Sequence, residues 1–339
     1  MITELLEKIS HGINLEESEA KNAMHAIMNG ELTNAQIAGF LMGLKMKGET
    51  VDEIAGFVHA MRDKATKIKA PDGVIDTCGT GGDRSGTFNI STAAALVAAA
   101  AGVPVAKHGN RSVSSKCGSA DVLQELGVKI DLTPEQSEQC LDQVGIAFLF
   151  APVYHSSMKY VAAPRKEMGV RTVFNILGPM SNPARAKRQI IGAFNFETAQ
   201  KMTHVLKKTG SEHVMVVHSR DGLDEISLQS NTLVSELKNG EIKDYELNPR
   251  ELGLKATSTT SIKGSDAKEN AQVIRRIFSG GNSAQHNITA LNAGSALYVS
   301  GKVKTIKEGV GLALETMKNN KALEKLNELV AFTNSVVAG

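Results

Sequence analysis

The chain has 339 residues, of which 42% are apolar, so it is long enough for two domains with a sizeable core. Its formal net charge of +2 is too small to indicate a polyanionic partner, and with 4% aromatic residues and no tryptophan it offers no base-stacking surface for nucleic acid. The three cysteines, Cys78, Cys117 and Cys140, form no CxxC pair, which predicts a reducing compartment without disulfides or a zinc site.

The N-terminal part of the chain carries helical signals only. One helix is predicted from Ser18 to the stop at Gly30. Capping boxes of the form Thr-x-x-Gln or Thr-x-x-Glu begin two more amphipathic helices at Thr33 and Thr50, and the first of these stops at Gly48. Charged residues in the opening MITELLEKIS argue against a signal peptide.

A domain boundary is predicted in the stretch KIKAPDG, where Pro71 and Gly73 interrupt the helical pattern. Residues 1–70 are expected to form a small helical domain, joined in space by helices near 155–185. Residues 71–339 are expected to form a larger α/β domain. The most apolar run in it, TAAALVAAAAGVPVA, is shorter than the ~20 residues of a spanning helix, so a cytoplasmic protein without a membrane segment is predicted.

From the boundary onward, short apolar strands alternate with helices. The predicted strands are GVIDTCG, VPVAK, IAFLF, QIIGA and HVMVVHS. The predicted helices are STAAALVAAAAG with Ser91 as N-cap, SADVLQELG, TPEQSEQCLDQVG, ETAQKMTHVLKKTG, and four near the C-terminus at 267–278, 288–299, 306–317 and from 323 onward. This alternation predicts an α/β fold with a central, mostly parallel sheet flanked by helices.

The turn after the first strand, DTCGTGGDRSGTFNIST, is rich in glycine. Such strand-to-helix turns often cradle phosphates, because backbone N–H groups approach closely and the helix N-terminus is electropositive. Arg84 stands where GxGxxG needs its third glycine, and no Gly-Lys-Ser/Thr follows, so both common phosphate fingerprints fail. Taken alone, the turn is equally well explained by glycine's freedom to adopt strained dihedral angles.

A second polar loop, KHGNRSVSSKCGSAD, follows the next strand. The carboxyl ends of parallel strands meet at one edge of a sheet, so the two loops are expected to face each other across a cleft. The second loop contributes three cations, Lys107, Arg111 and Lys116, and the hydroxyls of Ser112, Ser114, Ser115 and Ser119. Together the loops predict a ligand with several phosphates and a hydroxylated middle.

Two further features lie near the same edge. Asp224 and Glu225 follow a buried strand; alone they are typical of a solvated turn, but beside a polyphosphate they predict a magnesium site. Arg165 and Arg171 lie on a predicted short helical stretch that leads to the turns Gly178-Pro179 and Asn182-Pro183. Arginine grips planar carboxylates in bidentate fashion, and the alternative for Arg165 is a structural salt bridge.

These stretches together resemble the anthranilate phosphoribosyltransferases over essentially the whole chain. The residues that carry the resemblance are GTGGD, KHGNRSVSSKCGSADVLQELG, RTVFNILGP and DGLDE. The resemblance implies a helical domain on a larger α/β domain, as in pyrimidine nucleoside phosphorylases, and a homodimer formed through the helical domain. It also implies the transfer of phosphoribose from phosphoribosyl pyrophosphate to anthranilate, in tryptophan biosynthesis.

The family's site residues carry over position by position. Contacts to phosphoribosyl pyrophosphate fall on Gly79, Gly82, Asp83, Thr87, Asn89, Ile90, Ser91, Thr92, Lys107, His108, Gly109, Asn110, Arg111, Ser112, Val113, Ser114, Ser115 and Ser119. Contacts to anthranilate fall on Gly79, His108, Asn110, Arg165 and Gly178. The ligands of Mg²⁺, with two ions per active site, fall on Ser91, Asp224 and Glu225.

The chemistry implied needs charge neutralisation and alignment, and no catalytic proton-transfer residue is expected, because an aniline-type amine is already neutral at pH 7. The carboxylate of Asp83 within the phosphate loop leaves three roles open. It accepts hydrogen bonds from ribose hydroxyls, acts through magnesium, or pins loop N–H groups in an anion-facing pose.

Two other functions remain to be weighed. A pyrimidine nucleoside phosphorylase shares the fold and the glycine loop, but KHGN and Arg165 suit a carboxylated aromatic better than a pyrimidine. A non-enzymatic nucleic-acid-binding relative predicts a basic groove and eroded metal ligands. The nearly balanced charge and the intact pair Asp224 and Glu225 argue against it, so no nucleic-acid or membrane partner is expected.

Overall fold

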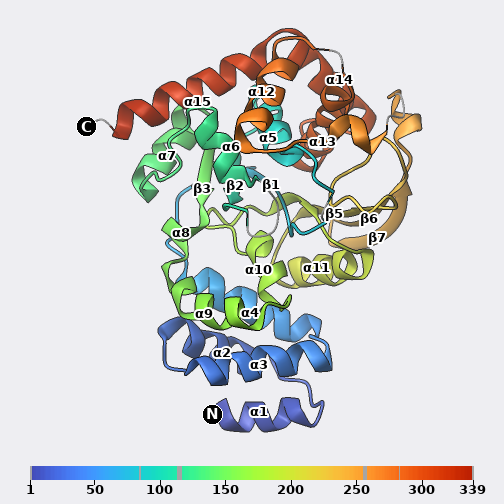
Figure 1. Ribbon diagram of the computed structural model, residues 1–339. Coiled ribbons are helices and arrows are strands. Elements are labelled where there is room, and N and C mark those ends of the chain that lie inside the picture. Colours follow the sequence, from blue (N-terminus) through green and yellow to red (C-terminus); the bar gives the residue numbers. More distant parts are fainter. Residues whose placement is uncertain (1, 84, 113–116, 255–257, 282, 338–339) are drawn as a thin grey trace.

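A seven-stranded sheet forms the centre of the larger part of the molecule in the computed structural model, which describes residues 2–83, 85–112, 117–254, 258–281 and 283–337 (Figure 1). The strand order is β3-β2-β1-β4-β5-β6-β7. The first five strands pair in parallel, as predicted, and are β1 (Ile75–Gly79), β2 (Val105–Gly109), β3 (Ile146–Phe150), β4 (Arg188–Gly192) and β5 (His213–Ser219).

The two remaining strands form an antiparallel hairpin that the strand prediction missed. They are β6 (Thr232–Lys238) and β7 (Glu241–Leu247), and β7 is the edge of the sheet. Asn239 and Gly240 make the two-residue turn with φ values of 52° and 78°. Asn-Gly is the pair that a type I′ hairpin turn prefers, so the sequence did contain the signal.

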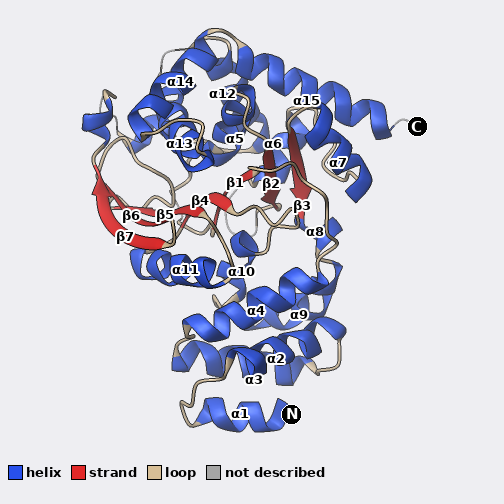
Figure 2. Ribbon diagram, turned by 180° about the vertical axis from the view of Figure 1, so that it is seen from behind, coloured by secondary structure: helices blue, strands red, loops and turns tan. Residues whose placement is uncertain are grey.

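Helices cover both faces of the sheet and build the separate helical part at the N-terminus (Figures 1 and 2). The N-terminal helices are α1 (Ile2–Ser10), α2 (Glu17–Asn29), α3 (Asn34–Lys47) and α4 (Val51–Lys64). The remaining helices are α5 (Ile90–Ala100), α6 (Ser119–Glu125), α7 (Pro134–Gln143), α8 (Ala151–Tyr154), α9 (Lys159–Met168), α10 (Phe174–Met180), α11 (Phe196–Lys208), α12 (Ala267–Phe278), α13 (Ala284–Ser300), α14 (Ile306–Lys318) and α15 (Lys321–Val337).

Several local predictions need correction. The N-cap of α5 is Asn89, so Ser91 lies inside the first turn of that helix. Helix α2 begins at Glu17, one residue before the predicted Ser18, and α13 begins four residues before the predicted position. Gly178 and Pro179 lie within α10 instead of forming a turn, since proline is tolerated where a short helix has few i−4 carbonyls to lose.

Two hydrophobic clusters lie on opposite faces of the sheet. Alternation along the strands separates them: Ile190 and Met215 face one cluster, whereas Ile191 and Val214 face the other. The first cluster includes residues of α5–α7 and α12–α15. The second joins α1–α4 to α9, α10 and α11. The helical part is therefore packed onto the sheet through α10 and α11.

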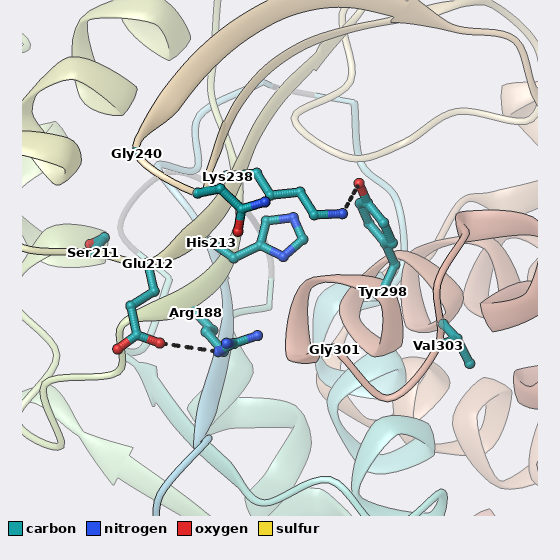
Figure 3. Close-up of a pocket in the computed structure, with 10 residues that line it drawn as sticks. Arg188, Ser211, Glu212, His213, Lys238, Gly240, Tyr298, Gly301 and Val303 are labelled. Atoms are coloured by element: carbon teal, nitrogen blue, oxygen red, sulfur yellow. Dashed lines mark hydrogen bonds and ion pairs between the residues drawn. The ribbon is translucent and has the colours of Figure 1, made fainter.

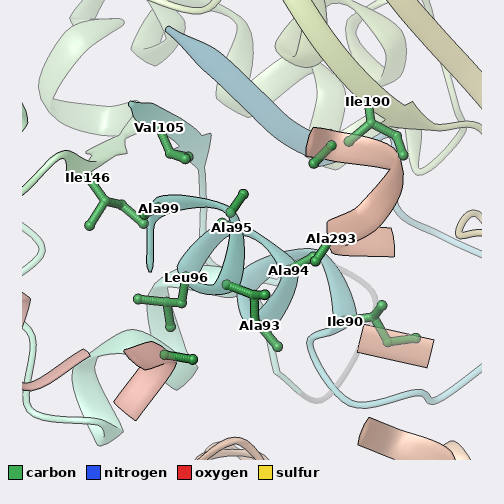
Figure 4. Close-up of a cluster of buried hydrophobic side chains, with 14 of the residues drawn as sticks. Ile90, Ala93, Ala94, Ala95, Leu96, Ala99, Val105, Ile146, Ile190 and Ala293 are labelled. Atoms are coloured by element: carbon green, nitrogen blue, oxygen red, sulfur yellow. The ribbon is translucent and has the colours of Figure 1, made fainter. Parts of the chain in front are cut away.

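Helix α5 lies at the centre of the first cluster (Figure 4). Its residues are buried on nearly every side, which explains the run of alanines: a helix surrounded by close neighbours needs small side chains all round. Among the described residues, no helix combines the length and apolar character required to cross a lipid bilayer.

Helices α13 and α14 approach each other at two glycines. A Cβ on Gly294 would lie 2.7 Å from the carbonyl carbon of Gly309, whereas a Cβ on Gly311, on the same α14, meets nothing within 4 Å. We therefore expect Gly294→Ala to destabilise the fold by about 1–3 kcal/mol through overpacking. Gly311→Ala should be neutral or stabilise by about 0.5–1 kcal/mol. Denaturant titration of both variants checks this; equal stabilities would show that the helices can separate freely.

Candidate active site

The two polar loops follow β1 and β2 at the same edge of the sheet, and Lys107 connects them. Lys107 is buried; its Nζ donates to the backbone carbonyl of Thr77 on β1 and, at 3.3 Å, to Oγ of Ser91. Burial lowers the pKa of Lys107, and the nearby charge of Asp76 opposes that shift. A cation is thus held at the junction of the glycine loop and the first turn of α5.

Ser91 also meets the predicted acidic pair. Its backbone N–H donates to Oε1 of Glu225 at 3.1 Å, across 134 positions in the chain. Asp224 packs against the last residues of β1 and β4. A Cβ on Gly79 would come within 3.2 Å of Oδ2 of Asp224, and a Cβ on Gly192 would overlap the backbone carbonyl of Asp224. The structure therefore brings the predicted metal ligands together, and Gly192 is a supporting position that no sequence motif singled out.

The carboxylates at this edge repel one another. Burial, followed by the charge of Asp83, raises the pKa of Asp224 to about 7. Burial and the charge of Asp224 raise the pKa of Glu225 well above its usual value. Such a cluster favours a cation between its members.

Magnesium fits this donor set. Among the described residues, no three His, Cys, Asp or Glu side chains gather closely enough to hold a metal by themselves. Mg²⁺ does not require such a cage, because it is usually bound by one or two carboxylates together with substrate phosphates and water. Asp224, Glu225 and the hydroxyl of Ser91 supply that kind of partial shell.

Asp83 lies beside the acidic pair. Its Oδ1 accepts a hydrogen bond from the backbone N–H of Ser85 at 3.1 Å, and its Oδ2 is buried with no hydrogen-bond donor among the described residues. One carboxylate oxygen therefore orders the loop, whereas the other has lost its hydration. The bond to Ser85 is a contact of the kind that ordering of the loop requires.

The second half of the glycine loop is tied to other segments. Asn89 donates from Nδ2 to the carbonyl of Cys117 in the second loop at 3.3 Å, and its Oδ1 accepts from Asn270 on α12 at 3.1 Å. Thr87 forms an isolated bridge with Lys263. Ile90 and Thr92 flank Ser91 in the first turn of α5. Asn89 is therefore a link between the two loops, which its predicted role in binding did not include.

Asp121 organises the second loop. Its Oδ2 accepts from the backbone N–H groups of Gly118, at 2.8 Å, and of Ser112, and its Oδ1 pairs with Arg111 at 2.8 Å. Arg111 is thus engaged by a carboxylate at one of its nitrogens. The predicted Val113, Ser114 and Ser115, together with Lys116, lie outside the described residues.

The end of β2 and the start of α6 are closely packed. Gly109 has no space for a Cβ, which would meet Oγ of Ser119 and the ring of Phe148. Oγ of Ser119 donates to the carbonyl of Asn110 at 3.3 Å. The side chain of Asn110 accepts from the N–H of Arg111 at 2.7 Å. These predicted residues therefore pack against one another where β2 ends and α6 begins.

His108 lies at the other side of the β2 loop. Its Nδ1 lies 3.2 Å from the carbonyl of Gly178 on α10, and its ring centroid lies 5.1 Å from that of His155. Its backbone N–H donates to Asp76, whose second oxygen accepts from Asn182 at 2.8 Å. Neither His155 nor the Asp76–Asn182 bond could be predicted from the sequence, because their partners are distant in the chain.

The two histidines are neutral in the folded protein. Burial, then the neighbouring His155, lowers the pKa of His108 to about 3, and burial lowers that of His155 to about 4. The unfolded chain takes up these protons near pH 6.5, so the folded state loses stability as the pH falls from about 6.5 toward 4.

From pH 6.5 to pH 5, each histidine is expected to cost about 2 kcal/mol of unfolding free energy. Denaturant titrations across this range should show a shallower pH slope for His155→Asn than for the parent protein. A variant at the exposed His11, His11→Asn, is the control. Parallel slopes for His155→Asn and the parent would contradict the assignment.

Arg165 lies on α9, outside the β-strand loops. Its guanidinium carbon lies 5.2 Å from the ring centroid of Phe174, and it forms no ion pair or hydrogen bond through its side chain with any described residue. Burial lowers its pKa. Phe174 and Gly178 are four residues apart on α10, so Arg165 and His108 contact positions about one turn apart on that helix. Arg171, predicted on the same helical stretch, lies beyond the end of α9.

The cysteines beside these loops are not activated. Burial, then the charge of Asp76, raises the pKa of the Cys78 thiol well above its ordinary value, and burial raises that of Cys117. Both therefore remain protonated thiols at neutral pH.

A cavity of about 430 Å³ lies at the opposite edge of the sheet, where β4 and β5 begin (Figure 3). Its charged groups already have partners: Arg188 lies 3.4 Å from Glu212, Lys238 donates to the hydroxyl of Tyr298 at 2.9 Å, and Nε2 of His213 lies 2.7 Å from Glu236. Because each of these groups already has a partner, the cavity offers a ligand fewer free polar groups than the other edge does.

Comparison with known proteins agrees with this division. The α/β domain of a glycosyl transferase family matches residues 71–323, and the helical bundle domain of a glycosyl transferase family matches residues 3–65. The anthranilate phosphoribosyltransferase of Acetivibrio thermocellus is 52% identical over 339 residues, covering 100% of this chain and 98% of that protein.

Solved structures give the same picture. The anthranilate phosphoribosyltransferase of Thermus thermophilus is 42% identical, with a TM-score of 0.92 over 97% of this chain and 99% of that one. The enzyme from Saccharomyces cerevisiae, solved in complex with PRPP and Mg, is 24% identical, with a TM-score of 0.89 over 98% of each chain. The latter likeness establishes a shared fold.

Proposed function

The chain belongs to the anthranilate phosphoribosyltransferase family, and from that premise we propose which of its residues carry out the reaction. The family transfers the phosphoribosyl group of phosphoribosyl pyrophosphate to the amine of anthranilate, releases pyrophosphate, and serves tryptophan biosynthesis. Full-length relatives with this name, at about half identity, support the transferase reaction over that of a pyrimidine nucleoside phosphorylase and over a non-enzymatic role.

The donor is proposed to bind between the glycine loop and the loop after β2. Lys107 brings a positive charge to the junction of these loops, and the electropositive N-terminus of α5 begins at the same place. Gly79 leaves room for the carboxylate of Asp224 beside the loop, and Asn89 holds the two loops together. These groups neutralise and align the leaving pyrophosphate, which is where negative charge develops.

Mg²⁺ is proposed to bind at Ser91, Asp224 and Glu225, with two ions per active site. When bound, the metal supplies charge neutralisation to the pyrophosphate oxygens. The raised pKa values of Asp224 and Glu225 support the assignment, because burial and a neighbouring carboxylate disfavour the charge of each, and a bound cation would offset both effects. Asp83 adds a third acidic group whose buried Oδ2 has no donor among the described residues.

The acceptor is proposed to bind near α10, which both Arg165 and His108 contact. Arg165 provides a guanidinium without an ion pair to any described residue, suited to the carboxylate of anthranilate. His108 is held in one orientation by Gly178 and His155. No residue is assigned to proton abstraction, because the amine attacks as a neutral group and alignment with the sugar carbon suffices.

The observation that carries this proposal is the meeting of Lys107, Ser91 and Glu225 at one sheet edge, where Glu225 lies 134 positions from Ser91 in the sequence. Mixing the protein with anthranilate, phosphoribosyl pyrophosphate and Mg²⁺ should abolish anthranilate fluorescence. Omitting either the donor or the metal should preserve it. Persistent fluorescence in the complete mixture would refute the proposed function.

A homodimer through the helical domain is proposed as the solution state. The four large hydrophobic residues that are exposed among the described residues, Ile13, Met46, Tyr160 and Val170, all lie in or beside the helical part, and Met46 is 82% exposed. Light scattering should give twice the 36.1 kDa mass of the chain.

The domain boundary is proposed to lie between residues 70 and 71. A reducing, cytoplasmic location is proposed for the protein, and its three free thiols support it.

A further inference from the structure

A chain of contacts joins the helical part of the molecule to the glycine loop through Arg171. Nζ of Lys45, on α3, donates to the backbone carbonyl of Arg171 at 2.7 Å. The guanidinium of Arg171 donates through Nη2 to the carbonyl of Gly82. The same guanidinium lies over the ring of Phe194, which follows β4, with 4.6 Å between Cζ and the ring centroid.

The Gly82 carbonyl sets the direction of the next N–H group. In a trans peptide the C=O and the following N–H point in opposite directions, so fixing the oxygen of Gly82 toward Arg171 turns the N–H of Asp83 away from it. That N–H has no acceptor among the described residues. It is therefore free to meet an anion in the loop.

Glycine is required for this contact. Gly82 has a φ of 81°, and a Cβ there would come within 3.2 Å of the guanidinium carbon of Arg171. A side chain at position 82 would thus push Arg171 off the carbonyl as well as strain the backbone.

We propose that Arg171 is a positioning residue, which holds the Gly82–Asp83 peptide with its N–H toward the pyrophosphate of the donor. Phe194 supports its guanidinium, and Lys45 ties its backbone to α3, so the pose of the donor loop depends on the helical part. The identity of the anion in this inference rests on the proposed function. The ordering of the glycine loop by Arg171 does not depend on that function.

The ordering is tested without any substrate by hydrogen–deuterium exchange. In Arg171→Ala and Phe194→Leu, amides of the segment 79–90 should exchange faster than in the parent protein. Lys187→Ala, which removes an exposed cation at the opposite edge of the sheet, is the control and should leave this segment unchanged. Unaltered exchange in Arg171→Ala would overturn the proposal, whatever the substrates of the enzyme are.

The consequence for the reaction is tested by steady-state kinetics. We expect Arg171→Ala to lower kcat/KM for phosphoribosyl pyrophosphate about tenfold, with little change in KM for anthranilate. Phe194→Leu and Lys45→Met should lower the same parameter by smaller factors, and Arg171→Lys should recover only part of it because lysine lacks the planar fork.

Two outcomes would contradict this role. Equal losses for both substrates together with a lower melting temperature would make Arg171 a merely structural residue. Full activity in Arg171→Lys, Phe194→Leu and Lys45→Met, with loss only in Arg171→Ala, would make it a direct phosphate ligand instead of a positioning group.

Discussion

The double variant Asp224→Asn/Glu225→Gln should require about a hundredfold more Mg²⁺ for half-maximal activity than the parent protein, because it loses two hard anionic ligands with almost no change in volume. The structure adds a second expectation. Burial raises the pKa values of both groups, and a neighbouring carboxylate adds to the shift: Asp83 for Asp224, and Asp224 for Glu225. Their ionised forms are therefore unfavourable in the metal-free protein.

Removing these charges should therefore stabilise the metal-free fold. At pH 8 in the presence of a chelator, we expect the melting temperature of the double variant to be a few degrees higher than that of the parent, reflecting an unfolding free energy larger by the order of 1–3 kcal/mol. A gain in stability together with a loss of metal response identifies groups held in place for a cation. Ordinary surface carboxylates would show neither effect.

Asp244→Asn/Glu246→Gln is the matched control, since it makes the same two kinds of substitution, at an aspartate and a glutamate of β7. Glu246 pairs with Arg220 at the surface, so this variant should leave the magnesium titration unchanged. If both double variants titrate like the parent, the acidic pair does not hold the metal. If Asp224→Asn/Glu225→Gln unfolds, the pair is structural.

Arg165→Ala should lower kcat/KM for anthranilate about thirtyfold or more while leaving KM for phosphoribosyl pyrophosphate nearly unchanged. Truncating one partner of a desolvated charge pair costs ~2–5 kcal/mol, and the low end applies to a partly exposed site. Arg165→Lys should rescue only part of the loss, because lysine keeps the charge without the bidentate fork.

The contacts of Arg165 separate this effect from a structural one. Since Arg165 has no ion pair with a described residue and loses only its ring contact with Phe174, the melting temperature of Arg165→Ala should change little. Arg62 is the control: it donates to the carbonyls of Met180 and Thr209 at 2.9 and 3.0 Å and connects α4 to α10 and α11.

Arg62→Ala should therefore lower the melting temperature and affect both substrates alike. Steady-state kinetics in each substrate, with thermal melts of the three variants, gives the comparison. A destabilised Arg165→Ala protein with an unaltered KM for anthranilate would remove Arg165 from the acceptor site.

Much of the fold could be predicted from local signals. Capping boxes at Thr33 and Thr50 start α3 and α4 at the predicted positions, and Thr133 caps α7, because these contacts form within four residues. The five parallel strands are short apolar runs between glycine and polar turns, and each lies where it was expected. The hairpin of β6 and β7 was also predictable from Asn239 and Gly240, but its strands are more charged than those of the buried sheet.

The candidate site was predictable as a set of loops. Polar residues that follow parallel strands must meet at one edge of the sheet, so Lys107, Ser91 and Glu225 could be expected together before any contact was known. Their identities as ligands came from the resemblance to a family, since spacing alone left the glycine turn ambiguous.

The tertiary structure alone decided which side chains support that edge. Gly192 makes room for Asp224, Asn182 holds Asp76 beneath His108, and Arg171 reaches Gly82 across 89 positions. None of these pairs has a periodic or local signature, because each depends on how distant segments pack. Sequence therefore determined the helices, the parallel strands and the edge at which the loops gather. The charge environment and the contacts that orient each functional group exist only once the chain has folded, since burial and non-local approach create them.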